Sequence, residues 1–155
     1  MRLFRRREPS ELVRGLPRLT DVPAMAELPR AKLQSAARYL GTVTEEDGEP
    51  VIGQSLSVKS SSRLHLSTEA LDVVRIAGSF RIPIEAMRGA TTDTHFEGKP
   101  VLDLLVIRWE HGGQDWRTGF RMEPTKNIKA GASAPELDHW VRTISKMARK
   151  TPGGR

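Results

Sequence analysis

The chain has no cysteine among its 155 residues and few aromatic side chains, namely three Trp, four Phe and one Tyr. The absence of cysteine excludes disulfide bonds, thiolate zinc sites and a cysteine nucleophile. No stretch approaches the about 20 consecutive apolar residues that a membrane-spanning helix requires. Because aromatic residues are scarce, the core must be mainly aliphatic, and the length is sufficient for one domain with such a core.

Motifs that carry chemistry are also missing. The sequence contains no nucleophile elbow, phosphate-binding loop or dinucleotide-binding glycine motif. The adjacent carboxylates of Glu45 and Glu46 fall in an expected exposed turn, whereas acid–base catalysis requires a shielded site. The four histidines are spread along the chain without a metal-binding spacing, at His65, His95, His111 and His139. We therefore expect no catalytic residue, no metal and no cofactor, and the sequence favours a binding protein over an enzyme.

The net charge of +6 is concentrated at the two ends of the chain. Residues 1–43 carry a net charge of +5, residues 44–133 carry −2, and residues 134–155 carry +3. Terminal basic segments are typical of attachment to a polyanion, although a solubilising tail is the simpler interpretation. The first residues resemble the basic start of a signal peptide, but no apolar run follows them. We therefore expect a cytoplasmic protein, with the inner face of the membrane as an alternative location.

The longest apolar run, residues 101–109, predicts a strand. It is rich in β-branched and large aliphatic residues, and Pro100 and the Gly112–Gly113 pair bound it. Alternation would place Leu102, Leu104 and Val106 on one face and Leu105, Ile107 and Trp109 on the other. Because both faces are apolar, we expect this strand inside the sheet, with cover on both sides.

Further alternating segments predict a total of about seven antiparallel strands, most of them joined by hairpins. Pro83 places its strand at an edge of the sheet. Pro29 predicts a short helix over residues 30–37, and residues 51–59 are expected to be irregular. The other strands are expected near residues 38–43, 63–67, 71–76, 80–84, 88–96 and 115–122.

The last element predicted is an amphipathic helix. Ser133 and Glu136 have the spacing of a capping box, and an apolar stripe follows at Leu137, Trp140, Val141, Ile144 and Ala148. One such helix can close the open corner of a strongly bent antiparallel sheet. The predicted fold is mainly β (α+β), a pleckstrin-homology-like (PH-like) barrel of about seven strands capped by a C-terminal helix. We expect residues 1–37 to form a basic, proline-punctuated arm with short helical segments, residues 38–150 the PH-like domain, and residues 151–155 a frayed tail.

Several short motifs resemble the PH-like domain proteins of actinobacteria, within the bacterial PH-like group. They occur over about residues 38–148, as Tyr39-Leu40-Gly41-Thr42, Ser55-Leu56-Ser57-Val58-Lys59-Ser60, Phe80-Arg81-Ile82-Pro83 with Met87-Arg88-Gly89, Gly98-Lys99, Val106-Ile107-Arg108-Trp109 and Thr118-Gly119-Phe120-Arg121. The resemblance implies the PH-like fold and no established chemistry. In that family the domain usually follows a transmembrane helix, in place of which we expect the basic arm here. Fold alone does not assign a function.

Three binding hypotheses follow, and the leading one is a non-enzymatic scaffold that binds a protein partner. Its candidate surface is Leu105, Ile107 and Trp109, taken to face outward, unless Leu12, Leu16 and Leu19 of the arm cover them. The second hypothesis is binding of anionic lipid by Lys59, Ser61 and Arg63, aided by Arg5, Arg6 and Arg7. Nucleic-acid binding is the third, disfavoured because Phe4 is the only aromatic residue in the basic arm.

Overall fold

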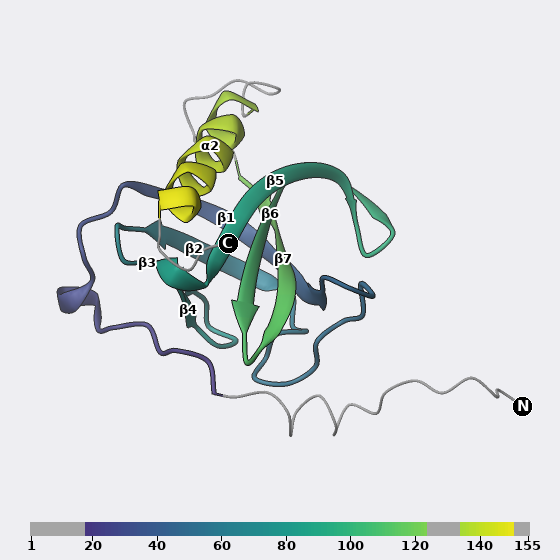
Figure 1. Ribbon diagram of the computed structural model, residues 1–155, viewed down its shortest axis with the longest axis horizontal. Coiled ribbons are helices and arrows are strands. Elements are labelled where there is room, and N and C mark those ends of the chain that lie inside the picture. The colour runs from purple at the N-terminus through teal and green to yellow at the C-terminus, as the bar shows by residue number, and fades with distance from the viewer. Residues whose placement is uncertain (1–17, 124–133, 151–155) are drawn as a thin grey trace, which may run out of the picture.

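A computed structural model describes residues 18–123 and 134–150. Within them, seven antiparallel strands form one sheet in the order β4-β3-β2-β1-β7-β6-β5, and a long helix packs on it (Figure 1). The strands are β1 (Leu33–Thr44), β2 (Ser60–Leu66), β3 (Ala70–Val74), β4 (Phe80–Pro83), β5 (Met87–Phe96), β6 (Lys99–His111) and β7 (Gln114–Met122). The helix is α2 (Ala134–Lys150), and the short 3-10 turns are η1 (Met25–Glu27) and η2 (Ile84–Ala86). The predicted mainly β, PH-like fold is confirmed.

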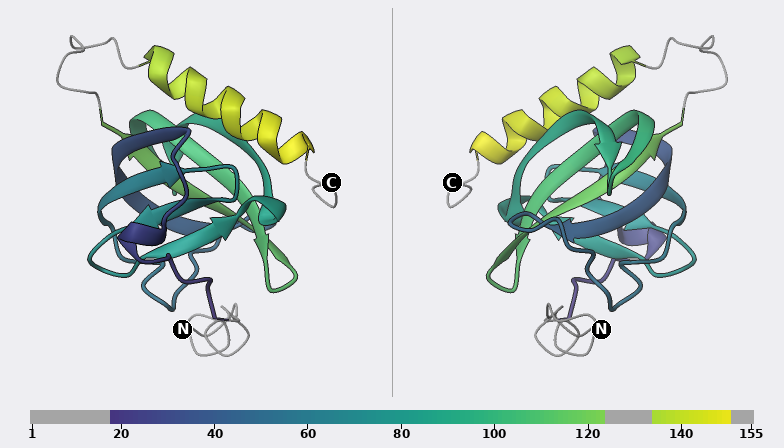
Figure 2. Two further views of the ribbon diagram at one scale, coloured as in Figure 1. Left: turned by 90° about the vertical axis from the view of Figure 1, so that its left-hand side faces the viewer. Right: turned by 90° about the vertical axis from the view of Figure 1, so that its right-hand side faces the viewer.

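Strand β1 connects the two halves of the sheet. Its residues 33–39 pair with β2, whereas residues 37–44 pair with β7, and the register shifts between Tyr39 and Gly41. Gly41 has φ +136°, a conformation that favours glycine, and an irregularity of this kind bends a strand. The sheet therefore wraps around one interior, and its two edge strands, β4 and β5, do not pair with each other (Figure 2).

Helix α2 lies across one end of the curved sheet (Figure 2). Its apolar stripe is buried there, with Trp140 2% and Ile144 0% exposed, in one cluster with the large core residues of β6. The Ser145 hydroxyl also donates to the Ala90 carbonyl of β5, at 3.2 Å. The prediction that the last helix closes the sheet is confirmed. Ser133 of the expected capping box lies outside the described residues.

The structure reverses the predicted direction of one face of β6. Leu105, Ile107 and Trp109 are at most 1% exposed and belong to the interior cluster, so the expectation that they face outward was wrong. Leu104 and Val106 lie on the outer side, where a second small cluster buries them. Phe96, the last residue of β5, belongs to this cluster together with Leu40 and Val43 of β1, and its ring lies against Gly119 of β7. Both faces of β6 are therefore covered over residues 104–109, as predicted, whereas Leu102, expected on the same face as Leu104, is 82% exposed.

Two local predictions have different outcomes. The helix expected over residues 30–37 is wrong, because β1 begins at Leu33 and pairs with β2 from Leu33 to Tyr39. Sheet pairing along a continuous strand outweighs the weak helical propensity of this segment. Pro83, in contrast, does end an edge strand, since β4 lies at one end of the sheet.

A chain of polar groups crosses the interior. The Trp109 indole N–H donates to the Thr118 hydroxyl at 2.9 Å. The Thr42 hydroxyl lies 2.8 Å from the Thr118 hydroxyl and 2.7 Å from the Tyr39 hydroxyl. Tyr39 donates to the Leu56 carbonyl. An indole N–H can only donate and a carbonyl can only accept, so each hydroxyl must donate toward Leu56. All four side chains are thus satisfied, and they hold the irregular segment 51–59 against the sheet.

Arg75 holds the same segment from inside the molecule. It is only 5% exposed, and its guanidinium lies 4.1 Å from the centre of the Tyr39 ring. It donates to the carbonyls of Val58, at 2.7 Å, and Ser55. Burial lowers the pKa of Arg75 and raises that of Tyr39. Backbone carbonyls and an aromatic face thus replace the carboxylate partner that a buried arginine usually has.

Candidate anion-binding surface

The three domain residues predicted to bind anions lie close together at the start of β2. Ser61 and Arg63 are exposed, whereas Ser62 and Leu64 between and beside them are buried. The alternation places Ser61 and Arg63 on the outer face of the sheet. Lys59 precedes the strand, and its half-exposed ammonium lies 3.9 Å from a Glu97 carboxylate oxygen. Arg5, Arg6 and Arg7 lie outside the described residues.

Strand pairing adds two arginines that the sequence analysis missed. Ser61 lies opposite Arg38 of β1, and Arg38 lies opposite Arg121 of β7, so the three form one row across three strands. Arg63 lies two residues along β2, diagonal to Arg38. Arg121 is exposed and Arg38 is half-buried. We call the group formed by Arg38, Lys59, Ser61, Arg63 and Arg121 the arginine face.

The three arginines of this face have no carboxylate of the described residues within ion-pair distance. Within residues 18–123 and 134–150, no ion pair closer than 4 Å joins Arg38, Arg63 or Arg121 to an acid. Glu97 lies beside Lys59, and Glu123 directly follows β7, but neither is within 4 Å of the guanidinium of Arg38, Arg63 or Arg121. The face therefore has a local excess of positive charge, although the segment between residues 44 and 133 is slightly acidic overall.

Exposed aliphatic side chains adjoin the arginine face. Ile76, in the β3–β4 hairpin, is fully exposed, and Val58 is 45% exposed. Ile76 lies two residues beyond Val74, the cross-strand partner of Arg63. Val58 precedes Lys59, and the hydrogen bond from Arg75 holds its carbonyl beside the same hairpin. Basic and apolar side chains are thus mixed on one side of the molecule.

A second arginine pair, elsewhere in the sheet, has an acidic side chain beside it. Arg108 of β6 lies directly opposite Arg117 of β7. A carboxylate oxygen of Glu45 lies 3.5 Å from Nε of Arg108 and 3.9 Å from Nε of Arg117. Like charges that face each other across strands are destabilising, and here one acidic side chain of the turn after β1 relieves the repulsion.

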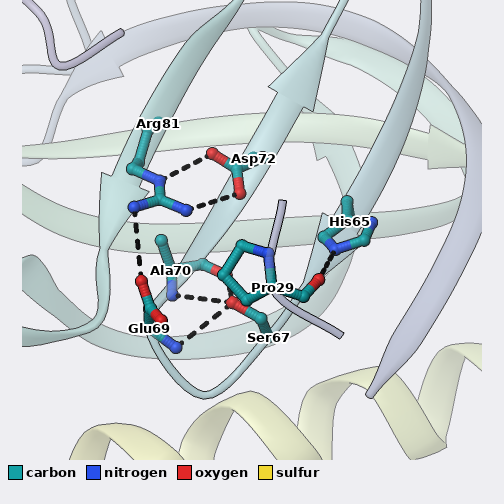
Figure 3. A network of polar contacts seen from close by, with 7 residues as sticks. All are labelled: Pro29, His65, Ser67, Glu69, Ala70, Asp72 and Arg81. Atoms are coloured by element: carbon teal, nitrogen blue, oxygen red, sulfur yellow. Dashed lines mark hydrogen bonds and ion pairs between the residues drawn. The ribbon is translucent and has the colours of Figure 1, made fainter. Parts of the chain in front are cut away.

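The described part of the arm contacts strands β2 and β4. Its Thr20 carbonyl accepts the Arg81 backbone N–H at 2.9 Å, and its Pro29 carbonyl lies 2.7 Å from His65 Nε2. Between these two contacts, Arg81 binds the buried Asp72 (Figure 3). Leu19 is also buried in the interior cluster, whereas Leu12 and Leu16 lie outside the described residues. Residues 18–32 are therefore held in cis across the row His65–Asp72–Arg81.

The histidines do not assemble a reactive centre. His65 is bound to the arm, and His95 lies near the exposed end of β5, which is not a neighbour of β2 in the sheet. His95 lines a shallow cleft of about 500 Å³ together with Glu97 and Arg117, but no serine, threonine or lysine lines it. Among the described residues, no group of three His, Asp or Glu side chains could hold a metal ion.

Comparison with known proteins agrees with this fold. Residues 16–135 match the family model described as bacterial PH domain-like, so the chain belongs to this family. A search of curated proteins gives no match. None of the helices in the described ranges has the length and apolarity needed to cross a membrane. Together these findings support a binding or scaffold module in general terms.

Proposed function

We propose that this domain is a non-enzymatic module that docks on an anionic membrane surface through the arginine face. One observation carries the proposal: the fully exposed Ile76 and the half-exposed Val58 adjoin a surface whose three arginines have no carboxylate of the described residues within 4 Å, although Lys59 lies near Glu97. Near an anionic leaflet, each basic residue contributes about 1 kcal/mol of attraction. Aliphatic side chains at the same surface can enter the boundary between headgroups and acyl chains.

The other two hypotheses have weaker support. Leu105, Ile107 and Trp109 are buried, so the patch first considered for a protein partner is not on the surface. Nucleic-acid binding lacks stacking platforms, because every Trp, Tyr and Phe of the described ranges is buried.

Co-sedimentation with vesicles tests the role of charge. We expect binding to vesicles that contain phosphatidylglycerol and none to pure phosphatidylcholine. The variant Lys59→Glu/Arg63→Glu should lose this binding, whereas Lys146→Glu/Arg149→Glu, with the same charge change on the exposed side of α2, should keep it. A further deletion of residues 1–8 measures how much Arg5, Arg6 and Arg7 contribute to vesicle binding. Binding that survives the deletion and Lys59→Glu/Arg63→Glu together would refute the proposal.

A second pair of variants tests the role of the aliphatic side chains. Ile76→Ser should weaken vesicle binding without changing the charge. Leu102→Ser is the matched control, because Leu102 is 82% exposed but lies on the β5–β6 hairpin, away from Ile76. Equal binding by the two variants would show that Ile76 does not enter the membrane surface.

A protein partner is the second candidate function, and one structural observation favours it. Strand β5 is an edge of the sheet, and its residues 91–95 are all exposed. An extended segment of a partner can add to such an edge through backbone hydrogen bonds. If this is so, Thr91→Arg/Thr94→Arg should abolish co-purification of a partner and leave vesicle binding unchanged. A partner retained by this variant would argue against the edge.

A further inference from the structure

We propose that Arg38 and Arg121, together with Ser61, form a discrete site for a phosphate monoester dianion. The site rests on the proposed function, because it names the headgroup that the arginine face would select. In this proposal, the dianion is the terminal phosphate of a lipid headgroup. Free phosphate shares the same chemistry, and the experiments below separate the two sources.

The positions of the two arginines provide the first argument. They are direct cross-strand partners on the outer face of β1 and β7. Side chains in this relation have Cβ atoms about 4.5–5.5 Å apart, and like charges there are destabilising. The fold thus makes two arginines direct cross-strand neighbours, an arrangement that costs stability. No acid of the described chain lies within ion-pair distance of either.

The second argument is the contrast with Arg108 and Arg117. They form the same kind of cross-strand pair one strand further along the sheet, and Glu45 reaches both of them. A single carboxylate oxygen can therefore lie within ion-pair distance of two opposed arginines in this sheet. Among the described residues, no carboxylate oxygen lies within 4 Å of Arg38 or Arg121 in the same way.

The third argument concerns the charge and the number of oxygens. Each guanidinium can donate two parallel hydrogen bonds to an oxyanion. A phosphate monoester carries a charge near −2 at neutral pH and three terminal oxygens, which match two arginines and the neighbouring hydroxyl of Ser61. A carboxylate or a phosphodiester carries only one negative charge and would leave the pair half-neutralised. Arg63, on the diagonal, adds a further positive charge.

Vesicle selectivity tests the site. At equal surface charge, the wild-type protein should bind vesicles with phosphatidic acid, a monoester, about tenfold more tightly than vesicles with phosphatidylglycerol, a diester. The variant Arg38→Gln/Arg121→Gln should lose this preference. Lys146→Gln/Arg149→Gln, which removes the same charge from α2, should keep it. Equal affinity of the wild-type protein for both lipids would overturn the site and leave the proposed function standing.

Thermal unfolding with inorganic phosphate tests the site without a membrane. The measurement is made at constant ionic strength and at a pH above the second pKa of phosphate. Phosphate should raise the unfolding temperature of the wild-type protein and not that of Arg38→Gln/Arg121→Gln. If phosphate acts in this way but no anionic vesicle binds, the site stands and the membrane function fails. If phosphate stabilises both proteins equally, the site is refuted. Tighter binding of a phosphoserine peptide than of phosphatidic acid vesicles would overturn the lipid source.

Discussion

Asp72 and Arg81 face each other across β3 and β4 and form a bidentate ion pair, with nitrogen–oxygen distances of 2.8 and 3.1 Å. The Asp72 side chain is completely buried and that of Arg81 is 15% exposed. The hydrogen bonds that Arg81 donates to Asp72 raise the pKa of Arg81. The Arg81 backbone N–H also binds the Thr20 carbonyl of the arm, and His65, opposite Asp72, contacts the Pro29 carbonyl. The ion pair therefore lies where the arm joins the sheet.

Asp72→Asn should lower the free energy of unfolding by about 3–5 kcal/mol, because it leaves the charge of Arg81 without its buried partner. Urea denaturation followed by tryptophan fluorescence measures the change. The double variant Asp72→Leu/Arg81→Met should lose less unfolding free energy than Asp72→Asn, since it removes both charges together. If the double variant is the less stable of the two, the pair contributes more than mutual neutralisation.

Gly119→Ala should destabilise the protein by about 1–3 kcal/mol through overpacking. A Cβ atom at this position would lie 2.8 Å from the Phe96 ring. Adding Phe96→Leu to Gly119→Ala should recover part of the loss, as a double-mutant cycle would show. Strictly additive effects of the two substitutions would mean that the ring is not the obstacle.

The ionisation of Tyr39, the only tyrosine of the chain, should require unfolding. Burial raises its pKa above the ordinary value of about 10. Above that pH the unfolded chain releases a proton that the folded protein retains, so stability should fall as the pH rises further. Phenolate absorbance should appear together with loss of structure, and Tyr39→Phe should remove this part of the pH dependence. Phenolate absorbance in the folded protein would contradict the buried hydroxyl chain.

Truncation of the buried stripe of α2 should be costly. Trp140→Ala and Ile144→Ala should lower the free energy of unfolding by about 3–5 and 2–5 kcal/mol, respectively, because both side chains fill the interior. Arg142→Ala on the same helix breaks only an exposed ion pair with Asp138 and should cost at most about 0.5 kcal/mol. Similar losses for all three variants in urea denaturation would indicate that the helix does not close the sheet.

The fold was largely predictable because its signals are local. Alternation along residues 101–109, the proline that ends β4 and the apolar stripe of α2 each report a buried face from a few neighbouring residues. The strand at residues 33–37 was missed because its partner β2 lies about 30 residues away along the chain. The inward direction of Leu105, Ile107 and Trp109 was missed for a similar reason, since both faces of β6 are apolar and alternation alone cannot tell which one faces inward.

The sequence by itself determined the class of the molecule, a mainly β domain with a closing helix and no chemical motif. It could do so because hydrophobic periodicity is a property of consecutive residues. It also identified Lys59, Ser61 and Arg63 as a basic, hydroxyl-rich segment. Only the tertiary structure placed Arg38 and Arg121 in the same row, across strands separated by up to about 80 residues. Strand pairing decides which distant charges become neighbours, and no local pattern encodes that choice.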